Sequence, residues 1–237
     1  MTLLTIVQDA CNEIGIAAPN SVYGSTDRTA KQMLALSNRS GKQLANRFAW
    51  QEMTIEATHT TIAAELQGSV ESILPGFNWY LYETMWNRTN RNVLWGPLFP
   101  SEWQFLKASN ITGPFPEFRI RNKNLYMLPA PAAGQTIGLE YISRYWCETS
   151  IGVDKEKWSS DTDVGILPED MLTIDLIWRF KAAKGLDYAE DMRQAEIYIN
   201  NAMARSGARR KMNLAGTGRS YPDTAYGLRV EDGSWTV

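Results

Sequence analysis

The chain has 237 residues, 44% of them hydrophobic and 21% charged, which is the composition of a globular protein able to bury a core. Its net charge of −2 and pI near 5.6 argue against a surface built throughout to neutralise phosphates, so tight non-specific DNA binding is not expected. No apolar run approaches the ~20 residues that cross a bilayer, and the N-terminus lacks the basic start and cleavage site of a secretory signal, so we expect no membrane partner.

Two helices are predicted at the N-terminus. The first covers residues 2–14 and ends at Gly15, which can adopt the left-handed cap conformation. After a loop at residues 17–25, Asp27 caps a longer helix that runs to residue 48. The apolar stripe of this helix has small residues at its centre, including Gly41, so we expect another helix to approach closely there.

The middle of the chain is predicted to be β. From Met53 onward apolar and polar residues alternate, as in a half-buried strand. Residues 118–121 and 124–128 flank a turn and should form a hairpin, and residues 136–146 are rich in β-branched and aromatic side chains. A short helix beginning at Pro100 should decorate this sheet.

Two further helices are predicted before the C-terminal tail. Pro168 suits a helix start and Gly185 a helix stop, while Asp187 followed by Glu190 is typical of a capping box for the next helix. The predicted apolar stripes are Met171, Ile174, Ile177, Trp178 and Ala182 in the first helix and Tyr188, Met192, Ala195, Ile199, Ala202 and Met203 in the second.

These elements predict an α+β fold. Neither helix pair can bury its stripe alone, so we expect the N- and C-terminal pairs to form a four-helix bundle, with an antiparallel β domain inserted between them and an extended C-terminal tail. The expected parts are 1–51 (N-terminal helices), 52–147 (β domain with its short helix), 148–167 (loop), 168–212 (C-terminal helices) and 213–237 (tail).

The search for catalytic, cofactor and metal sites predicts none. His59 is the only histidine, which excludes a two-histidine zinc motif within one chain, and it is expected to be a strand residue with a satisfied hydrogen bond. Cys11 and Cys147 are too few for a disulfide framework and are expected to be packed thiols. Asp161 and Asp163 are similar to the start of a calcium loop, but the later ligands are not at the required spacing.

Several stretches, in one order, resemble the head-to-tail adaptor (connector) proteins of tailed bacteriophages and prophages. They are LLTIVQDACNEIGI (3–16), TAKQMLALSNRSGKQLANRFAWQ (29–51), ETMWNRTNRNVLWGPLFPSEWQ (83–104) and DTDVGILPEDMLTIDLIWRFKAAKGLDYAED (161–191). The resemblance implies a ring of helices with a projecting β domain. Such a ring is dodecameric, docks under the portal and links the DNA-filled capsid to the tail.

The same resemblance implies the partners and the location. We expect a homo-oligomer that contacts the portal protein above and a tail or nozzle protein below, and a lumen that passes DNA without sequence-specific binding. The protein would assemble in the host cytoplasm, reside at the head–tail junction of the virion, and serve tail assembly, genome packaging and DNA ejection. It would not be an enzyme.

Three sets of residues are the candidate contacts. Polar side chains off the core stripe of the second helix should contact a neighbouring subunit: Gln32, Arg39 and Gln43. The tail should contact the portal or a neighbouring subunit through Arg219, Tyr221, Tyr226, Leu228, Arg229 and Trp235. A basic cluster at the end of the last helix complements the helix terminus or contacts an acidic partner or DNA: Arg205, Arg209, Arg210 and Lys211.

Two other functions stay open. A carbohydrate- or receptor-binding β module of a tail would need Trp79, Trp86 and Trp95 to share one solvent-facing groove. A tail-associated hydrolase would need a cleft with a suitably spaced carboxyl pair. Helix capping and the helix dipole already explain the acidic residues that it might use, namely Glu169, Asp170, Asp187, Glu190 and Asp191.

Overall fold

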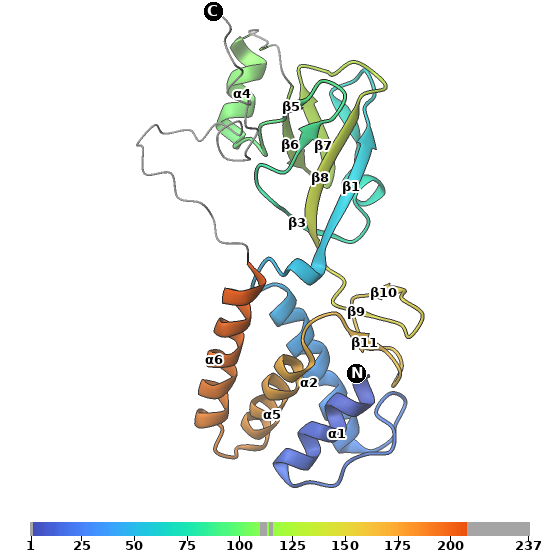
Figure 1. Cartoon of the computed structure of the whole chain (residues 1–237), viewed down its shortest axis with the longest axis vertical. Coiled ribbons are helices and arrows are strands. Elements are labelled where there is room, and N and C mark those ends of the chain that lie inside the picture. Colours follow the sequence, from blue (N-terminus) through green and yellow to red (C-terminus); the bar gives the residue numbers. More distant parts are fainter. Residues whose placement is uncertain (1, 110–112, 114–115, 208–237) are drawn as a thin grey trace, which may run out of the picture. The chain divides into compact units, whose positions relative to one another are not determined.

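The computed structural model describes residues 2–109, 113 and 116–207 and has an α+β fold with antiparallel sheets (Figure 1). The predicted contacts in the tail, and Arg209, Arg210 and Lys211, therefore lie outside the described residues. None of the described helices has the length and apolar character needed to cross a membrane.

The N-terminal helices begin where their caps predict. Helix α1 (Leu3–Ile14) is capped by Thr2, whose side chain accepts a hydrogen bond from the Thr5 N–H, and it ends at Gly15 with φ of 80°. Helix α2 (Arg28–Ala45) begins after Asp27, whose carboxylate accepts from the Ala30 N–H at 2.8 Å. It ends at Ala45 rather than at the predicted residue 48.

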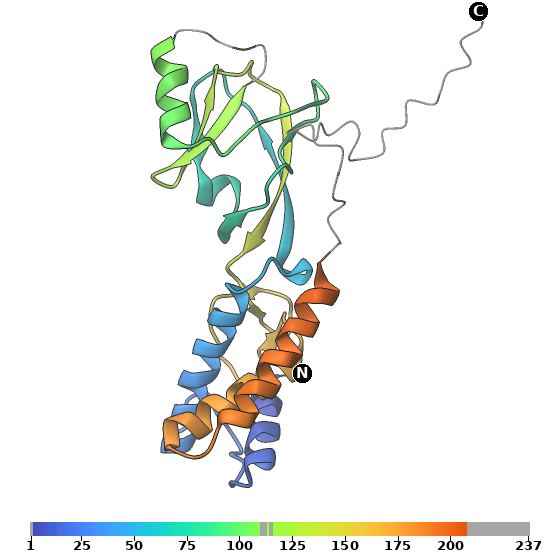
Figure 2. The ribbon, with the colours of Figure 1, turned by 90° about the vertical axis from the view of Figure 1, so that its left-hand side faces the viewer.

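The C-terminal helices lie side by side as a hairpin (Figures 1 and 2). Helix α5 (Glu169–Lys184) has Pro168 at its N-cap and Gly185, with φ of 71°, at its C-cap. Helix α6 (Ala189–Ser206) follows. The start and stop signals therefore locate α5 to within one residue.

The capping box predicted for α6 is wrong. Tyr188 occupies the N-cap without a side-chain cap, and Asp187 accepts only a 3.3 Å hydrogen bond from the Ala189 N–H. Glu190 instead pairs with Arg193 one turn later, and this ion pair lowers the pKa of Glu190 to about 2. A neighbouring cation on the same helix competes successfully for the carboxylate that the box would have used.

The single apolar stripe predicted for α5 is also wrong, because this helix is buried on most of its circumference. Its buried side chains are Met171, Leu172, Thr173, Asp175, Leu176, Ile177 and Phe180. Ile174, Trp178 and Ala182 are only partly buried. Helices α1, α2 and α6 all pack against α5, so three neighbours cover it and a one-sided pattern is not required.

Two hydrophobic clusters organise the described residues. One includes residues from α1, α2, α5 and α6, among them Leu3, Met33, Leu176 and Ile199. The other belongs to the β region and includes Phe118, Met127, Leu139 and Tyr141. Residues far apart in the chain thus share the helical core, and the intervening segment has a core of its own.

The β region contains two sheets. In the larger sheet the strand order is β1-β8-β4-β5, and β3 also pairs with β8. Its strands are β1 (Thr54–Thr60), β3 (Phe77–Tyr80), β4 (Trp86–Asn87), β5 (Asn92–Val93) and β8 (Thr136–Ser143). The smaller sheet has the order β2-β7-β6, formed by β2 (Leu66–Ser69), β6 (Glu117–Arg121) and β7 (Asn124–Leu128).

The predicted hairpin is present as β6 and β7, joined by Asn122 and Lys123 with φ of 48° and 59°, as a type I′ turn requires. The remaining helical pieces of this region are the 3-10 turn η1 (Gln51–Met53), α3 (Val70–Ile73) and α4 (Pro100–Ser109).

The segment predicted as a loop at 148–167 instead carries part of a third sheet. Its short strands are β9 (Cys147–Glu148), β10 (Asp154–Lys155) and β11 (Val164–Gly165). Two residues per strand leave no alternating pattern in the sequence. Trp146 precedes β9 and Trp158 lies between β10 and β11, and their rings pack edge to face with centroids 4.9 Å apart.

Trp146 also accounts for the small residue at the centre of α2. A Cβ added to Gly41 would lie 2.2 Å from the Trp146 ring. Another helix does approach the centre of α2, since α5 packs against α2 and its Asp175 accepts a hydrogen bond from Ser40. At Gly41 itself, however, the Trp146 ring takes up the space.

Candidate functional site

The predicted subunit contacts lie on α2. Arg39 and Gln43 are exposed and Gln32 is half-buried. Among the residues that the structure describes, no ion pair involves Arg39. Whether these side chains contact a neighbouring subunit stays a prediction. Arg205 is likewise exposed, in the last turn of α6.

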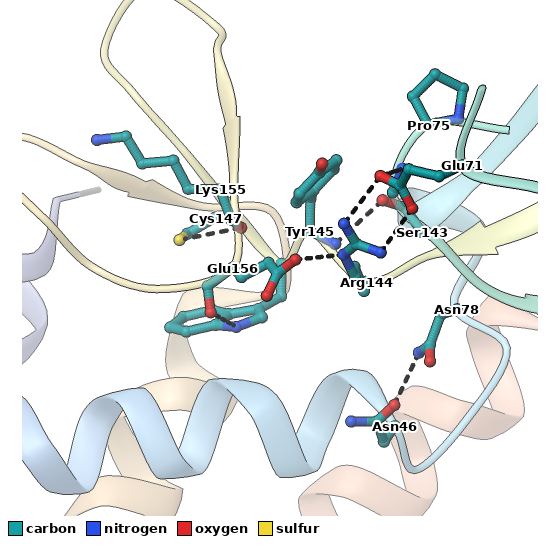
Figure 3. A network of polar contacts seen from close by, with 12 residues as sticks. Asn46, Glu71, Pro75, Asn78, Ser143, Arg144, Tyr145, Cys147, Lys155 and Glu156 are labelled. Atoms are coloured by element: carbon teal, nitrogen blue, oxygen red, sulfur yellow. Dashed lines mark hydrogen bonds and ion pairs between the residues drawn. The ribbon is translucent and has the colours of Figure 1, made fainter. Parts of the chain in front are cut away.

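A polar junction forms where the chain leaves β8 (Figure 3). Arg144 donates two hydrogen bonds of 2.9 Å to the Glu71 carboxylate and a third, from Nε, to Glu156. The hydrogen bonds from Arg144 lower the pKa of Glu71, and those to Glu71 raise the pKa of Arg144. One guanidinium therefore ties the α3 segment to the β9–β10 segment.

Other contacts connect the same region to the helices. The Asn78 amide donates to the Asn46 side chain just after α2 at 2.7 Å, and the Trp146 indole donates to the Glu156 carbonyl at 2.7 Å (Figure 3). At the end of α6, Ser206 accepts from the Gln51 N–H. Sequence reasoning missed this junction, since its members are separated by dozens of residues and share no motif.

A second network lies inside the helical core. Asp175 on α5 is 2% exposed and accepts from the Ser40 hydroxyl on α2, from the Trp178 indole at 2.8 Å and from Arg179 Nε at 2.6 Å. The guanidinium of Arg179 also stacks over the Trp178 ring, 4.5 Å from its centroid. A buried carboxylate with this many donors fixes α2 against α5, because a shift of either helix would break charged hydrogen bonds.

Asp161 and Asp163, which were considered for metal binding, instead hold neighbouring segments through hydrogen bonds and an ion pair. Asp161 accepts from the Ser21 hydroxyl and from the N–H groups of Val22 and Tyr23, which ties down the loop between α1 and α2. Asp163 is buried and pairs with Lys155 at 2.7 Å. Among the described residues no group of three or more potential ligands is placed to hold a metal ion.

Burial and hydrogen bonding oppose each other at Asp163. Burial alone would raise its pKa, but the hydrogen bonds from Lys155 and from the N–H groups of Ser159 and Ser160 outweigh it and lower the pKa. The carboxylate is therefore held in its charged form by the segment around it.

His59 and the two cysteines lie in partly buried or buried surroundings. His59 lies on β1, but its Nε2 atom is buried without a hydrogen-bond partner in the described part of the chain, so the expected satisfied bond is wrong for that atom. Cys11 and Cys147 are both buried, as predicted for packed thiols. Burial raises the pKa of Cys147 to about 12.

The three tryptophans of the carbohydrate-binding alternative have different surroundings. Trp79 is half-buried and packs against the helical core cluster, Trp86 is half-buried on β4, and Trp95 is 38% exposed. A cavity of about 380 Å³ lies elsewhere, lined by residues that include Glu52, Tyr145, Glu148 and Asp154 and by no tryptophan.

The acidic residues weighed for the hydrolase alternative also lie away from that cavity, since Glu169, Asp170, Asp187, Glu190 and Asp191 are not among its lining residues. Several of them have structural partners: Asp191 pairs with Lys181 and Glu190 with Arg193.

Comparison with known proteins adds no assignment. The sequence matches no protein-family model, and no curated protein is significantly similar to it.

Proposed function

We propose that this protein is a structural component of a tailed-phage virion, an adaptor ring that docks under the portal and links the DNA-filled capsid to the tail. The observation that carries the proposal is the sharing of one hydrophobic cluster by α1, α2, α5 and α6, with the β region inserted between the helix pairs and possessing its own core. This is the arrangement that the resemblance to head-to-tail adaptors implies.

In this proposal the four helices act as a bundle that builds a dodecameric ring, and the β region reaches toward a tail or nozzle protein. Arg144 supports such a role, because its bonds to Glu71 and Glu156 hold the base of the β region. Arg39 and Gln43 supply an exposed face of α2 for a neighbouring subunit. The ring lumen forms part of the DNA conduit.

Loss of the protein during infection tests the proposal. Capsids that lack it should package DNA but then lose it, or fail to acquire tails, and electron micrographs of the purified wild-type protein should show rings of twelve subunits. A loss-of-function phenotype confined to cell lysis or cell-wall cleavage would contradict the proposal, as would a wild-type protein that is absent from purified virions.

The tail supplies a separable test. Truncation after Met212 removes the predicted anchors, including Tyr221, Tyr226 and Trp235. Their large aromatic side chains make them suitable contacts to a portal or a neighbouring subunit. The truncated protein should stay folded but dock poorly onto portal-bearing capsids. If the truncated protein docks as well as the wild type, the role proposed for the tail is refuted, but the proposal of an adaptor ring is not.

A further inference from the structure

The two N-terminal helices carry charges of opposite sign. Residues 1–27 contain Asp9, Glu13 and Asp27 but no lysine or arginine, whereas residues 28–49 contain only basic charges. Here the sign changes once, at the start of α2.

The basic residues of α2 form one exposed face. Arg28, Lys31, Arg39 and Lys42 are all exposed, and at 3.6 residues per turn they fall within about a quarter of the helix circumference. None of the four makes an ion pair with a residue that the structure describes. We name these four residues the basic face.

An acidic surface is formed by α1 and the first turn of α5. Asp9 and Glu13 are exposed and lie one turn apart on α1, and Asp170 is exposed on α5. Glu169 lies close to two of these carboxylates: burial raises its pKa, and the charges of Asp9 and Asp170 raise it further. Asp9, Glu13 and Asp170 make no ion pair within the described part of the chain. We name them the acidic face.

The two faces belong to different helices, since the basic face lies on α2 and the acidic face on α1 and α5. Helices α1 and α2 each pack against α5, whereas contacts between α1 and α2 are sparse. Within the described part of one subunit, no ion pair joins the basic face to the acidic face. A contact between two different patches of identical subunits is head-to-tail, which is the kind of contact that closes into a ring.

We propose that the basic face of one subunit docks on the acidic face of the next copy of this chain. The inference rests on the ring proposed above and assigns the surfaces that build it. A second copy is favoured over DNA because the chain itself carries the complementary surface, which is exposed and forms no ion pair with any residue that the structure describes. Opposite charges arranged in this way steer association, fix the register and suppress like-with-like contacts.

A charge-swap experiment on the full-length protein tests the proposal. The variant Lys31→Glu/Arg39→Glu reverses the basic face, and Asp9→Lys/Glu13→Lys reverses the acidic face. Each variant should raise the protein concentration needed for ring formation by about tenfold, a shift of the size expected for a few exposed charge pairs. Combining all four substitutions should restore ring formation, because every interface then carries the opposite pairing. Analytical ultracentrifugation measures the assembly.

Matched measurements separate assembly from folding. Lys157→Glu reverses an exposed lysine outside both faces and should leave ring formation unchanged, and all variants should keep the far-UV circular dichroism of the wild type. Raising the salt concentration from about 0.1 M to about 0.5 M should weaken wild-type assembly, since screening shortens the range of surface charges.

The outcomes distinguish this inference from the proposed function. If wild-type rings form but neither single reversal weakens them, or if the combined variant stays as defective as its parents, the assigned surfaces are wrong and the adaptor role stands. A wild-type protein that forms no ring, alone or on portal-bearing capsids, overturns both. If Lys31→Glu/Arg39→Glu abolishes binding to double-stranded DNA and leaves rings intact, the basic face serves nucleic acid and the inference is refuted.

Discussion

Replacing Gly41 by alanine should destabilise the protein, against the usual effect of this substitution in a helix. The new Cβ would lie 2.2, 2.3 and 2.5 Å from three carbons of the Trp146 ring, whereas ordinary contacts are 3.4–4 Å. The ring must therefore move by more than 1 Å. Its indole bond to Glu156 and its packing against Trp158 oppose that movement.

The expected magnitude follows from two opposing terms. Gly→Ala in a helix interior stabilises by about 1 kcal/mol, while forced overpacking of a core costs typically about 1–3 kcal/mol and sometimes more. Because the overlap at Gly41 exceeds what small adjustments relieve, we expect the cost to lie at the upper end, which leaves a net loss of about 2 kcal/mol in the free energy of unfolding.

Urea unfolding followed by far-UV circular dichroism measures this loss. The decisive control is the same substitution made in a Trp146→Leu background, where the smaller side chain provides room. There Gly41→Ala should be neutral or stabilising by up to about 1 kcal/mol. A stabilising effect of Gly41→Ala in the wild-type background would refute the packing argument.

Three further outcomes are expected. Arg179→Met should cost about 3–5 kcal/mol of unfolding free energy, because it leaves the Asp175 carboxylate buried beside fewer donors, and Asp175→Asn in the same chain should recover part of this loss in urea unfolding. Folding lowers the pKa of Asp163 below its ordinary 3.8, so its ionised form stabilises the fold at neutral pH. This contribution to the free energy of unfolding disappears as the pH falls below about 4. Asp163→Asn should therefore make the free energy of unfolding less dependent on pH in that acidic range. Cys147, whose pKa is raised to about 12, and buried Cys11 should react with a thiol reagent at pH 8 only after unfolding, and rapid labelling of the native protein would contradict their burial.

Local chemistry in the sequence determined where most helices and turns begin and end. Thr2 and Gly15 bound α1, Asp27 begins α2, and the turn at Asn122 and Lys123 joins β6 to β7. These signals work because each cap or turn satisfies backbone groups within a few residues of itself. Two such predictions failed: the capping box at Glu190, where an ion pair with Arg193 competes for the carboxylate, and the end of α2, which lies at Ala45 and not at residue 48.

Hydrophobic periodicity predicted less, because burial depends on how many neighbours an element receives. The sequence treats Trp178 as a core residue and says nothing of Asp175, yet Asp175 is buried and Trp178 only partly so. Three helices surround α5, and one of them, α2, brings the Ser40 hydroxyl to the carboxylate. A buried charge is stable only when such hydrogen-bond donors are present. Only the tertiary packing of the helices brings the Ser40 donor to the Asp175 carboxylate.

The candidate contact surfaces were likewise predicted only in part from the sequence. The sequence alone predicted that Arg39 and Gln43 of α2 are exposed, because the side of a helix opposite its apolar stripe faces solvent. Only the tertiary structure brought Asp9 and Asp170 close to Glu169, and joined Glu71, Arg144 and Glu156 at the base of the β region. Contacts between residues so distant in the chain depend on how the elements pack, and no local pattern in the sequence encodes that packing.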